Sequence, residues 1–144
     1  MDFGVCVDYR KLNSITKKDS FPMPRIDDTL DKLCGKKFFS TLDLASAYYQ
    51  MELEESAKEK TAFVIEDHLC QFARMPFELC NGPPTFQLLM NYALSDVLGK
   101  KALVYLDDVI IYSDTFEQQL EDLREVFELI KTTKLTLQFK KCQL

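Results

Sequence analysis

Two adjacent carboxylates, Asp107 and Asp108, lie between two short apolar runs, residues 102–104 and 109–111. Charged groups beside a core are costly to desolvate, so a solvated hairpin turn is one interpretation of this pair. A third carboxylate, Asp43, follows another strand-like run that begins at residue 38. If the strands pair side by side, the three carboxylates converge, and converging carboxylates repel unless a divalent cation lies between them.

The hydrophobic pattern predicts the elements that would position these acids. Residues 38–44 and 135–139 are strand-like, and residues 102–112 are typical of a hairpin with the two acids at its tip. With one helix before the hairpin and one after it, the order becomes strand, helix, strand, strand, helix, strand. That order indicates an α+β fold of the ferredoxin-like (split βαβ) type. Residues 51–81 interrupt it and are expected to form a separate subdomain with short strands at 51–54, 61–65 and 69–74.

The two helices are predicted from apolar residues that recur every three or four positions. The first follows Pro83 and Pro84 and ends at Gly99. The second begins near Asp114 and Glu117, whose spacing resembles a capping box. We expect both apolar faces to be buried in the core. They consist of Phe86, Leu89, Met90, Ala93, Leu94 and Val97 in the first helix, and of Phe116, Leu120, Leu123, Phe127 and Ile130 in the second.

The composition limits which classes of protein are compatible with this sequence. A chain of 144 residues with 47% hydrophobic residues is long enough to bury one core. It has no apolar run of the roughly 18 residues that a membrane span needs, and no secretory signal pattern. Five scattered cysteines indicate thiols in a reducing compartment. A zinc site is improbable because His68 is the only histidine.

The net charge of −5 argues against an autonomous nucleic-acid binder, which would need clustered Lys and Arg. The charge is unevenly distributed. Residues 1–40 hold eight basic and six acidic side chains, whereas residues 41–144 hold ten basic and seventeen acidic ones.

Four blocks, in order, resemble the motifs of reverse transcriptases from gypsy-class LTR retrotransposons. The catalytic blocks are Ser40-Thr41-Leu42-Asp43-Leu44-Ala45-Ser46-Ala47-Tyr48-Tyr49-Gln50 and Tyr105-Leu106-Asp107-Asp108. The other two are residues 6–13 and 75–87. The resemblance covers nearly the whole chain. It implies a polymerase palm of ferredoxin-like topology, built from residues 19–50 and 82–144, and partial fingers, built from residues 1–18 and 51–81.

The resemblance also implies roles for single residues. Asp43 and Asp107 would ligate two Mg²⁺ ions (Mn²⁺ being possible) together with the Leu44 carbonyl, and Asp108 would be the third acid, next to the primer end. Asp8 and Arg10 would brace the template side of the fingers, although an exposed ion pair of little energetic worth is the alternative. The residues that would contact the nucleotide are Leu44, Ala45, Ser46, Ala47, Tyr48 and Gln87. For Tyr48 the alternative is a half-buried aromatic, and for Gln87 a solvated residue on a helix face.

In the parent enzyme the partners would be an RNA or DNA template with its primer and deoxynucleoside triphosphates, in an intracellular, cytoplasmic setting with no membrane. Two departures from the family pattern bear on activity: Gly4 stands where the family has an Arg that grips the triphosphate, and Glu78 where it has a Gly. The thumb, connection and RNase H domains are expected to be absent. We therefore expect this isolated chain to be impaired or inactive in primer extension and to bind nucleic acid weakly or not at all.

Two other interpretations stay open. A domesticated, non-catalytic interaction module could keep the palm fold. A ferredoxin-like RNA-binding module would read bases with exposed aromatic residues of its sheet. The acidic balance and the acids at the hairpin argue against the second of these, and a Mg²⁺ titration separates the first from an enzyme.

Overall fold

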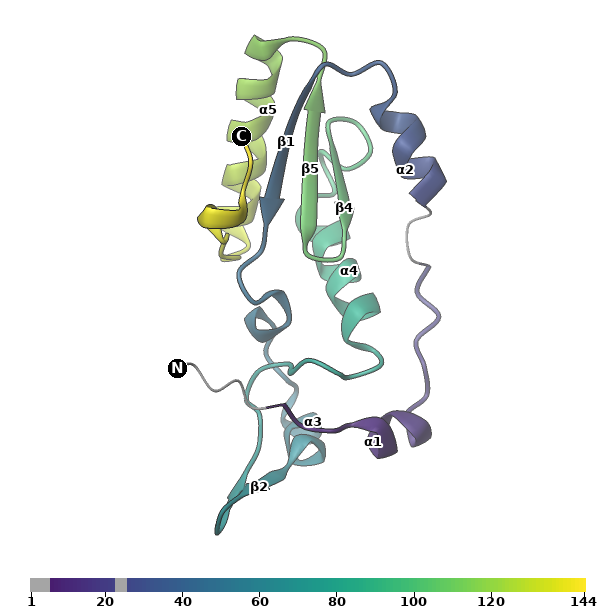
Figure 1. Ribbon diagram of the computed structural model, residues 1–144, viewed down its shortest axis with the longest axis vertical. Helices are drawn as coiled ribbons and strands as arrows, with labels where there is room; N and C mark the ends of the chain where they lie inside the picture. Colours follow the sequence, from purple (N-terminus) through teal and green to yellow (C-terminus); the bar gives the residue numbers. More distant parts are fainter. Residues whose placement is uncertain (1–5, 23–25) are drawn as a thin grey trace.

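The structure is a computed structural model that describes residues 6–22 and 26–144. Its elongated body has an upper part built around a sheet and a smaller lower part (Figure 1). The strands are β1 (Phe38–Asp43), β2 (Phe63–Ile65), β3 (His68–Cys70), β4 (Ala102–Tyr105) and β5 (Asp108–Ser113). The α-helices are α1 (Arg10–Ile15), α2 (Ile26–Leu33), α3 (Glu55–Lys58), α4 (Gly82–Ala93) and α5 (Phe116–Thr132). Short 3-10 helices are η1 (Ala47–Gln50), η2 (Glu59–Thr61) and η3 (Phe139–Lys141).

The upper part contains a three-stranded antiparallel sheet in the order β1-β5-β4. The predicted hairpin is formed by β4 and β5, and β1 pairs with β5 over its whole length. Side chains alternate between the two faces, so Leu42, Val109 and Ile111 point into the core. Because Asp43 is the register partner of Asp108, this pairing brings the two acidic motifs to one end of the sheet.

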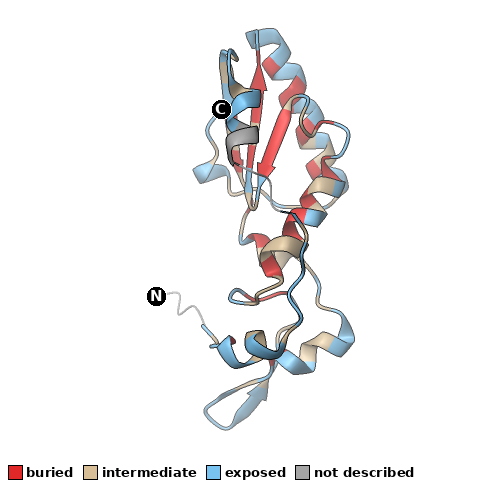
Figure 2. Cartoon of the chain, turned by 90° about the vertical axis from the view of Figure 1, so that its right-hand side faces the viewer, coloured by how far each residue is buried: buried red, intermediate tan, exposed pale blue. Residues whose placement is uncertain are grey.

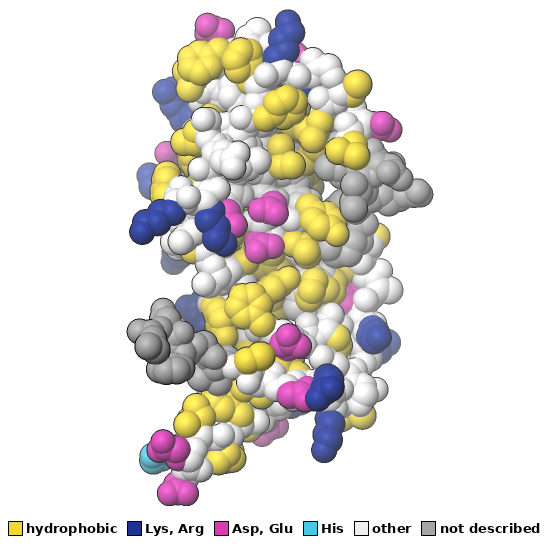
Figure 3. Space-filling model, in the orientation of Figure 1, with side chains coloured by type: hydrophobic (Ala, Val, Ile, Leu, Met, Phe, Trp, Pro, Cys, Tyr) yellow, Lys and Arg dark blue, Asp and Glu magenta, His cyan; other side chains and the backbone are white. Residues whose placement is uncertain are grey.

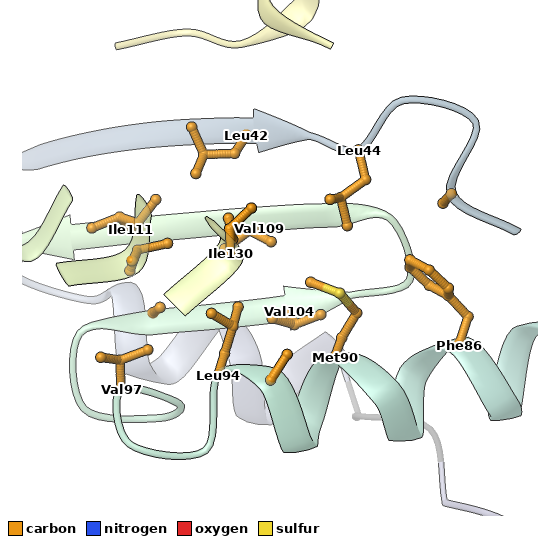
Figure 4. Close-up of a cluster of buried hydrophobic side chains, with 14 of the residues drawn as sticks. Leu42, Leu44, Phe86, Met90, Leu94, Val97, Val104, Val109, Ile111 and Ile130 are labelled. Carbon is orange, nitrogen blue, oxygen red and sulfur yellow. The ribbon is translucent and has the colours of Figure 1, made fainter. Parts of the chain in front are cut away.

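Helices α4 and α5 cover the buried face of the sheet, and their apolar side chains meet those of the strands (Figure 4). The first helix buries its apolar face as predicted, but it ends at Ala93 and not at Gly99, because the chain passes into turns from Leu94 onward. It starts with proline in its first turn, where a missing N–H costs nothing, and five of its six expected core residues, counting Leu94 and Val97 just beyond its end, are buried while Leu89 is partly buried.

Helix α5 departs from its predicted face. Leu123 and Ile130 are buried and Phe127 partly so, but Phe116 and Leu120 are about half exposed, so the expectation that they are core residues is wrong. Their places on the buried face are taken by other residues, which are Gln119, Asp122 and Val126. The two polar residues can be buried because the sheet supplies them with hydrogen-bond partners.

The start of α5 also differs from the prediction. Thr115, rather than Asp114, is the N-cap, and its hydroxyl accepts a hydrogen bond from the Gln118 amide at 3.2 Å. Asp114 instead accepts a hydrogen bond from the Lys36 ammonium, at 3.0 Å.

The predicted last strand, residues 135–139, does not form. An isolated bridge pairs Leu137 with Leu44, just after β1, and a second bridge pairs Gln143, beyond the segment, with Thr41. Between the two bridges the chain coils into η3. Leu135 and Leu137 still pack against the core, as their alternation predicts. The segment thus lies along the outer edge of β1 without becoming a regular fourth strand.

The lower part holds α1, α3 and the small antiparallel sheet of β2 and β3, and it is mostly exposed (Figure 2). Two of its three predicted strands form in shortened versions, whereas residues 51–54 contribute only the bridge between Glu52 and Arg74. Among the residues that the structure describes, no helix is both long and apolar enough to cross a membrane.

Candidate active site

The hairpin between β4 and β5 places Asp107 in its turn and Asp108 in a strand. Its turn residues are Leu106 and Asp107, whereas Asp108 is already the first residue of β5. The prediction of both acids at the tip is therefore only half right. Leu106 adopts φ +55°, a left-handed conformation that a leucine enters at a cost of about 1 kcal/mol. The tight turn thus depends on bonds from the surrounding structure.

The backbone of Asp43 lies beside that of both other acids. Asp43 is the register partner of Asp108, and the amide of the next residue, Leu44, donates to the Asp107 carbonyl at 3.2 Å. On its other edge, the Asp43 carbonyl accepts from the Gln138 amide at 2.8 Å. The end of β1 is consequently held between the hairpin and the C-terminal segment, with three acids around it.

A cation of the protein itself reaches into this group. The Lys141 ammonium, on η3, lies 3.4 Å from Asp43 Oδ2, and the Asp43 side chain is only 20% exposed. Acidic side chains gather near the middle of the face drawn in Figure 3, with basic side chains beside them. No group of three His, Cys, Asp or Glu side chains within the described ranges is arranged to hold a metal ion.

The pKa of Asp108 is changed by its burial and by the charges of its neighbours. Partial desolvation, followed by the negative charges of Asp107 and Asp43, raises its pKa above the ordinary 3.8, and Lys141 offsets part of this rise. Ionising Asp108 therefore costs more in the folded chain than in the unfolded one. The cost is present at neutral pH and disappears as the pH falls below 3.8, where the carboxyl is protonated in both states.

We accordingly expect Asp108→Asn to raise the melting temperature at pH 7. The rise should be modest, up to about 2 °C, because the side chain is exposed and its interactions are screened. Thermal unfolding of both proteins between pH 3 and pH 8 measures it. The gap should close toward pH 3, and a gap that stays constant with pH would contradict the electrostatic explanation.

The loop after Asp43 is tied to the C-terminal segment. Ser46 has φ +48° and precedes η1, and Ala47 is buried. Gln50, at the end of η1, donates to the carbonyls of Ala45 (2.7 Å) and Thr136 (3.0 Å) and accepts from the Thr136 amide (2.7 Å). Gln50 thus fixes the loop that the sequence assigns to the nucleotide, a contribution that its position in the motif did not reveal.

Tyr48 lies in a cluster of aromatic rings. Its ring makes edge-to-face contacts with Phe77 and Phe86, at centroid distances of 5.3 Å and 5.6 Å. Burial, and then the charge of Asp107, raises the pKa of the Tyr48 hydroxyl. The side chain is thus half buried, as the simpler interpretation expects, and it also lies on the same side of the sheet end as an acid.

Gln87 is fully buried, so the alternative interpretation of it as a solvated helix residue is wrong. Its Nε2 donates to Asn91 Oδ1 (2.9 Å) and to the Val104 carbonyl (3.3 Å). Its Oε1 accepts from the Leu106 amide at 2.9 Å. Both amide hydrogens are therefore used within the protein, at the base of the acidic hairpin.

Asp8 and Arg10 form an exposed ion pair in the lower part of the molecule, with 2.6 Å between Asp8 Oδ2 and Arg10 Nη2. Asp8 also accepts a hydrogen bond from the Arg10 backbone amide at 2.9 Å. The side-chain hydrogen bond from Arg10 lowers the pKa of Asp8 to about 2. Both side chains are largely in solvent, where a pair of this kind contributes little to stability.

The loop around Glu78 connects the lower part to the upper part. Asn13 donates to the Glu78 carbonyl at 2.7 Å and accepts from the Cys80 amide at 2.9 Å. Glu78 has φ +73°, a left-handed conformation that suits glycine. It lines a cavity of about 380 Å³ together with Tyr49 and Phe77. Gly4, the other departure noted above, lies outside the described residues.

Comparisons with known proteins agree with this geometry. A family model described as reverse transcriptase (RNA-dependent DNA polymerase) matches residues 4–144. The chain is 43% identical over 141 residues to the Retrovirus-related Pol polyprotein from transposon 297 of Drosophila melanogaster, covering 98% of this chain and 13% of the polyprotein. It is 39% identical over 131 residues to an RNA-directed DNA polymerase homolog from Oenothera berteroana, covering 89% of this chain and 92% of that protein.

Among solved structures, the foamy viral protease-reverse transcriptase in complex with an RNA/DNA hybrid superposes with a TM-score of 0.87 at 25% identity. The match covers 95% of this chain and 18% of the viral chain. The mixed helix-and-sheet fold is therefore that of a reverse transcriptase polymerase domain, and the chain spans about an eighth of the transposon polyprotein that it matches. The convergence of its acidic motifs, its family model and its relatives lead to one conclusion: this chain belongs to the reverse transcriptase family.

Proposed function

We propose that the chain carries the catalytic centre of template-directed DNA synthesis, with Asp43, Asp107 and Asp108 as its catalytic acids. The observation behind this proposal is the meeting of both acidic motifs at one sheet end. Asp43 and Asp108 are register partners, and Asp107 is bonded to the backbone next to Asp43. The reaction is the addition of a deoxynucleotide to a primer hydroxyl, in which positioning and charge neutralisation supply most of the catalysis.

We also propose the subdomain division. The palm would comprise residues 19–50 and 82–144, and the fingers residues 1–18 and 51–81. The sheet order β1-β5-β4, with the C-terminal segment bridged to the free edge of β1, supports a ferredoxin-like palm whose last strand is reduced to two bridges. The mostly exposed lower part, which contributes little to the core of the upper part, supports its assignment to a separate fingers subdomain.

The donor set fits Mg²⁺ or Mn²⁺, because carboxylate oxygens are the ligands that these hard cations take. Asp43, Asp107 and Asp108 would hold the ions with the Leu44 carbonyl. Two such ions activate the attacking oxygen and stabilise the leaving one. Rotation of these carboxylates and release of Asp43 from Lys141 would be needed, and neither requires a change in the backbone register.

The remaining assignments concern substrates. We propose that an RNA or DNA template with its primer lies across the open face of the sheet, and that Asp8 and Arg10 brace the template side. The residues from Leu44 to Tyr48 would border the deoxynucleoside triphosphate. Tyr48 supports this assignment because its ring is fixed by Phe77 and Phe86, so it can act as a rigid wall against a sugar.

A metal titration tests the proposal. Mn²⁺ should raise the melting temperature, because a ligand of the folded state stabilises it by about 2.7 kcal/mol at a hundred times its dissociation constant. Asp107→Asn should abolish the rise. Asp67→Asn is the matched control, since Asp67 is an exposed acid in the turn between β2 and β3. The same rise in Asp107→Asn would refute the site, and no rise in the unmodified chain would favour a non-catalytic module that keeps the fold.

A further inference from the structure

The acidic hairpin tip needs support that its own sequence does not supply. Leu106 is held at φ +55° although it is not a glycine, and Asp107 follows it directly in the turn. The alternative conformations of such a turn are open to a leucine, and each of them would redirect Asp107. The direction of Asp107 therefore depends on whatever holds the Leu106 backbone.

Gln87 makes the hydrogen bond that holds the Leu106 backbone. From α4, its Oε1 accepts from the Leu106 amide (2.9 Å), and its Nε2 donates to the Val104 carbonyl (3.3 Å) on the strand that leads into the turn. One amide group thus bonds the hairpin on both sides of Tyr105. Because Gln87 is completely buried, no water competes for these bonds.

The backbone of the hairpin sets the orientation of that amide, and Asn91 supports it. An amide can be rotated to exchange its oxygen and nitrogen, and only one orientation offers an acceptor to Leu106. The Leu106 amide, which can only donate, and the Val104 carbonyl, which can only accept, fix that orientation. Asn91 Oδ1, one helical turn later, accepts the second Gln87 hydrogen at 2.9 Å and adds a third bond to it. The pair forms a brace from α4 to the turn, which lies opposite the bond from the Leu44 amide to the Asp107 carbonyl.

We propose that Gln87 is a positioning residue for Asp107, acting through the Leu106 amide, and that it does not itself touch the nucleotide. The inference rests on the proposed function, in which Asp107 is a metal ligand. It assigns Gln87 a different task from the nucleotide contact expected from the sequence motif. It also makes Asn91 a member of the same brace.

The test compares Gln87→Met with a matched control, Gln119→Met. Gln119 is another buried glutamine that bonds a helix to the sheet, through Ser40 and the Ile111 carbonyl, but it makes no bond to the hairpin tip. Both changes should lower the melting temperature by about 5 °C, because each leaves buried polar groups of the sheet without a hydrogen-bond partner. Only Gln87→Met should weaken Mn²⁺ binding, by about tenfold or more, the range for residues that orient metal ligands.

Free Mn²⁺, measured by electron paramagnetic resonance below the melting temperature of every variant, gives the dissociation constants. Hydrogen exchange of the Leu106 amide gives a readout that needs no metal, and it should accelerate at least tenfold in Gln87→Met but not in Gln119→Met. Asn91→Ala should accelerate it by a smaller factor, and it replaces Gln87→Met if that variant does not fold.

Unchanged Leu106 exchange, or equal loss of Mn²⁺ affinity in both glutamine variants, would overturn the inference. Failure of the unmodified chain to bind Mn²⁺ would count against the proposed metal site instead, and Leu106 exchange would still decide whether Gln87 holds the turn.

Discussion

Replacing Asp122 with alanine should lower the free energy of unfolding by about 3 kcal/mol, the lower end of the range for removing one partner of a buried ion pair. The Asp122 side chain is 2% exposed and accepts hydrogen bonds from Ser113 (2.7 Å) and Gln118 (2.9 Å). Its Oδ1 also lies 3.0 Å from the Lys101 ammonium. The lower end applies because Lys101 keeps a second partner, Glu125, at 2.6 Å.

Chemical denaturation measures this loss, and Asp114→Ala is the control. Asp114 also pairs with a lysine, but its side chain is 69% exposed, so its removal should change the free energy by less than about 0.5 kcal/mol. Similar losses in the two variants would show that the bonds of Asp122 do not anchor α5 to the sheet.

The pH dependence of this stabilisation follows from the same contacts. Burial alone would raise the pKa of Asp122, but the hydrogen bonds from Ser113, Gln118 and Lys101 together outweigh burial and lower it. A carboxyl with a lowered folded-state pKa contributes stability above its unfolded value of 3.8, and the contribution is lost as the pH falls through the folded value. The difference between the unmodified chain and Asp122→Ala should therefore shrink under acid conditions.

Replacing Glu78 with glycine should have two separable effects. Relief of the left-handed conformation should stabilise the chain by about 1 kcal/mol. The resemblance to the family implies that this loop packs close to the nucleotide. Loss of a negative charge there should strengthen binding of Mg²⁺-dATP about tenfold, the size expected for two charges on the order of 10 Å apart at an effective dielectric constant near 20. Binding can be followed by NMR titration, which measures millimolar affinities.

The chain contains its own control for this experiment. Glu66, in the turn between β2 and β3, is also exposed and left-handed, with φ +52°. Glu66→Gly should therefore stabilise the chain by a similar amount without altering the affinity for Mg²⁺-dATP. An equal gain in affinity in both variants would mean that backbone strain, rather than the charge at position 78, accounts for the effect.

The parts of the fold that follow from apolar periodicity could be predicted from the sequence. The pairing of β4 with β5, the start of α4 at its prolines and the burial of Met90 are of this kind, because each depends on a local pattern that tertiary contacts reinforce. The arrival of Asp43 beside Asp108 could also be anticipated, since Asp43 ends one strand-like run and Asp108 directly precedes another.

Other features depend on partners that no local pattern reveals. Hydrophobic periodicity placed Phe116 and Leu120 inside, whereas the structure buries Gln119 and Asp122 in the same helix, because Ser40 and Ser113 reach them from the sheet. The burial and hydrogen bonds of Gln87 could not be predicted for the same reason, since its three bonds come from α4 and the hairpin together.

Local backbone conformation explains the remaining predictions that were wrong. The alternating residues 135–139 predicted a strand, but the chain coils at Phe139 and pairs with β1 only at two points. Leu106 enters a left-handed turn that a glycine would have signalled, and no sequence rule identifies a leucine held there by a distant glutamine.

The C-terminal segment along β1 has a consequence for synthesis of the protein. Asp43 and Lys141 are 98 positions apart, and Gln50 reaches Thr136 across 86. Contacts of such long sequence separation carry a loop-closure cost and form late in folding. During translation, the second edge of β1 at Asp43 can therefore be covered only after the chain has been synthesised as far as Lys141. A ribosome that stalls before Lys141 would leave a nascent chain with all three acids already made and an exposed sheet edge beside them, which is the state most open to capture by another strand.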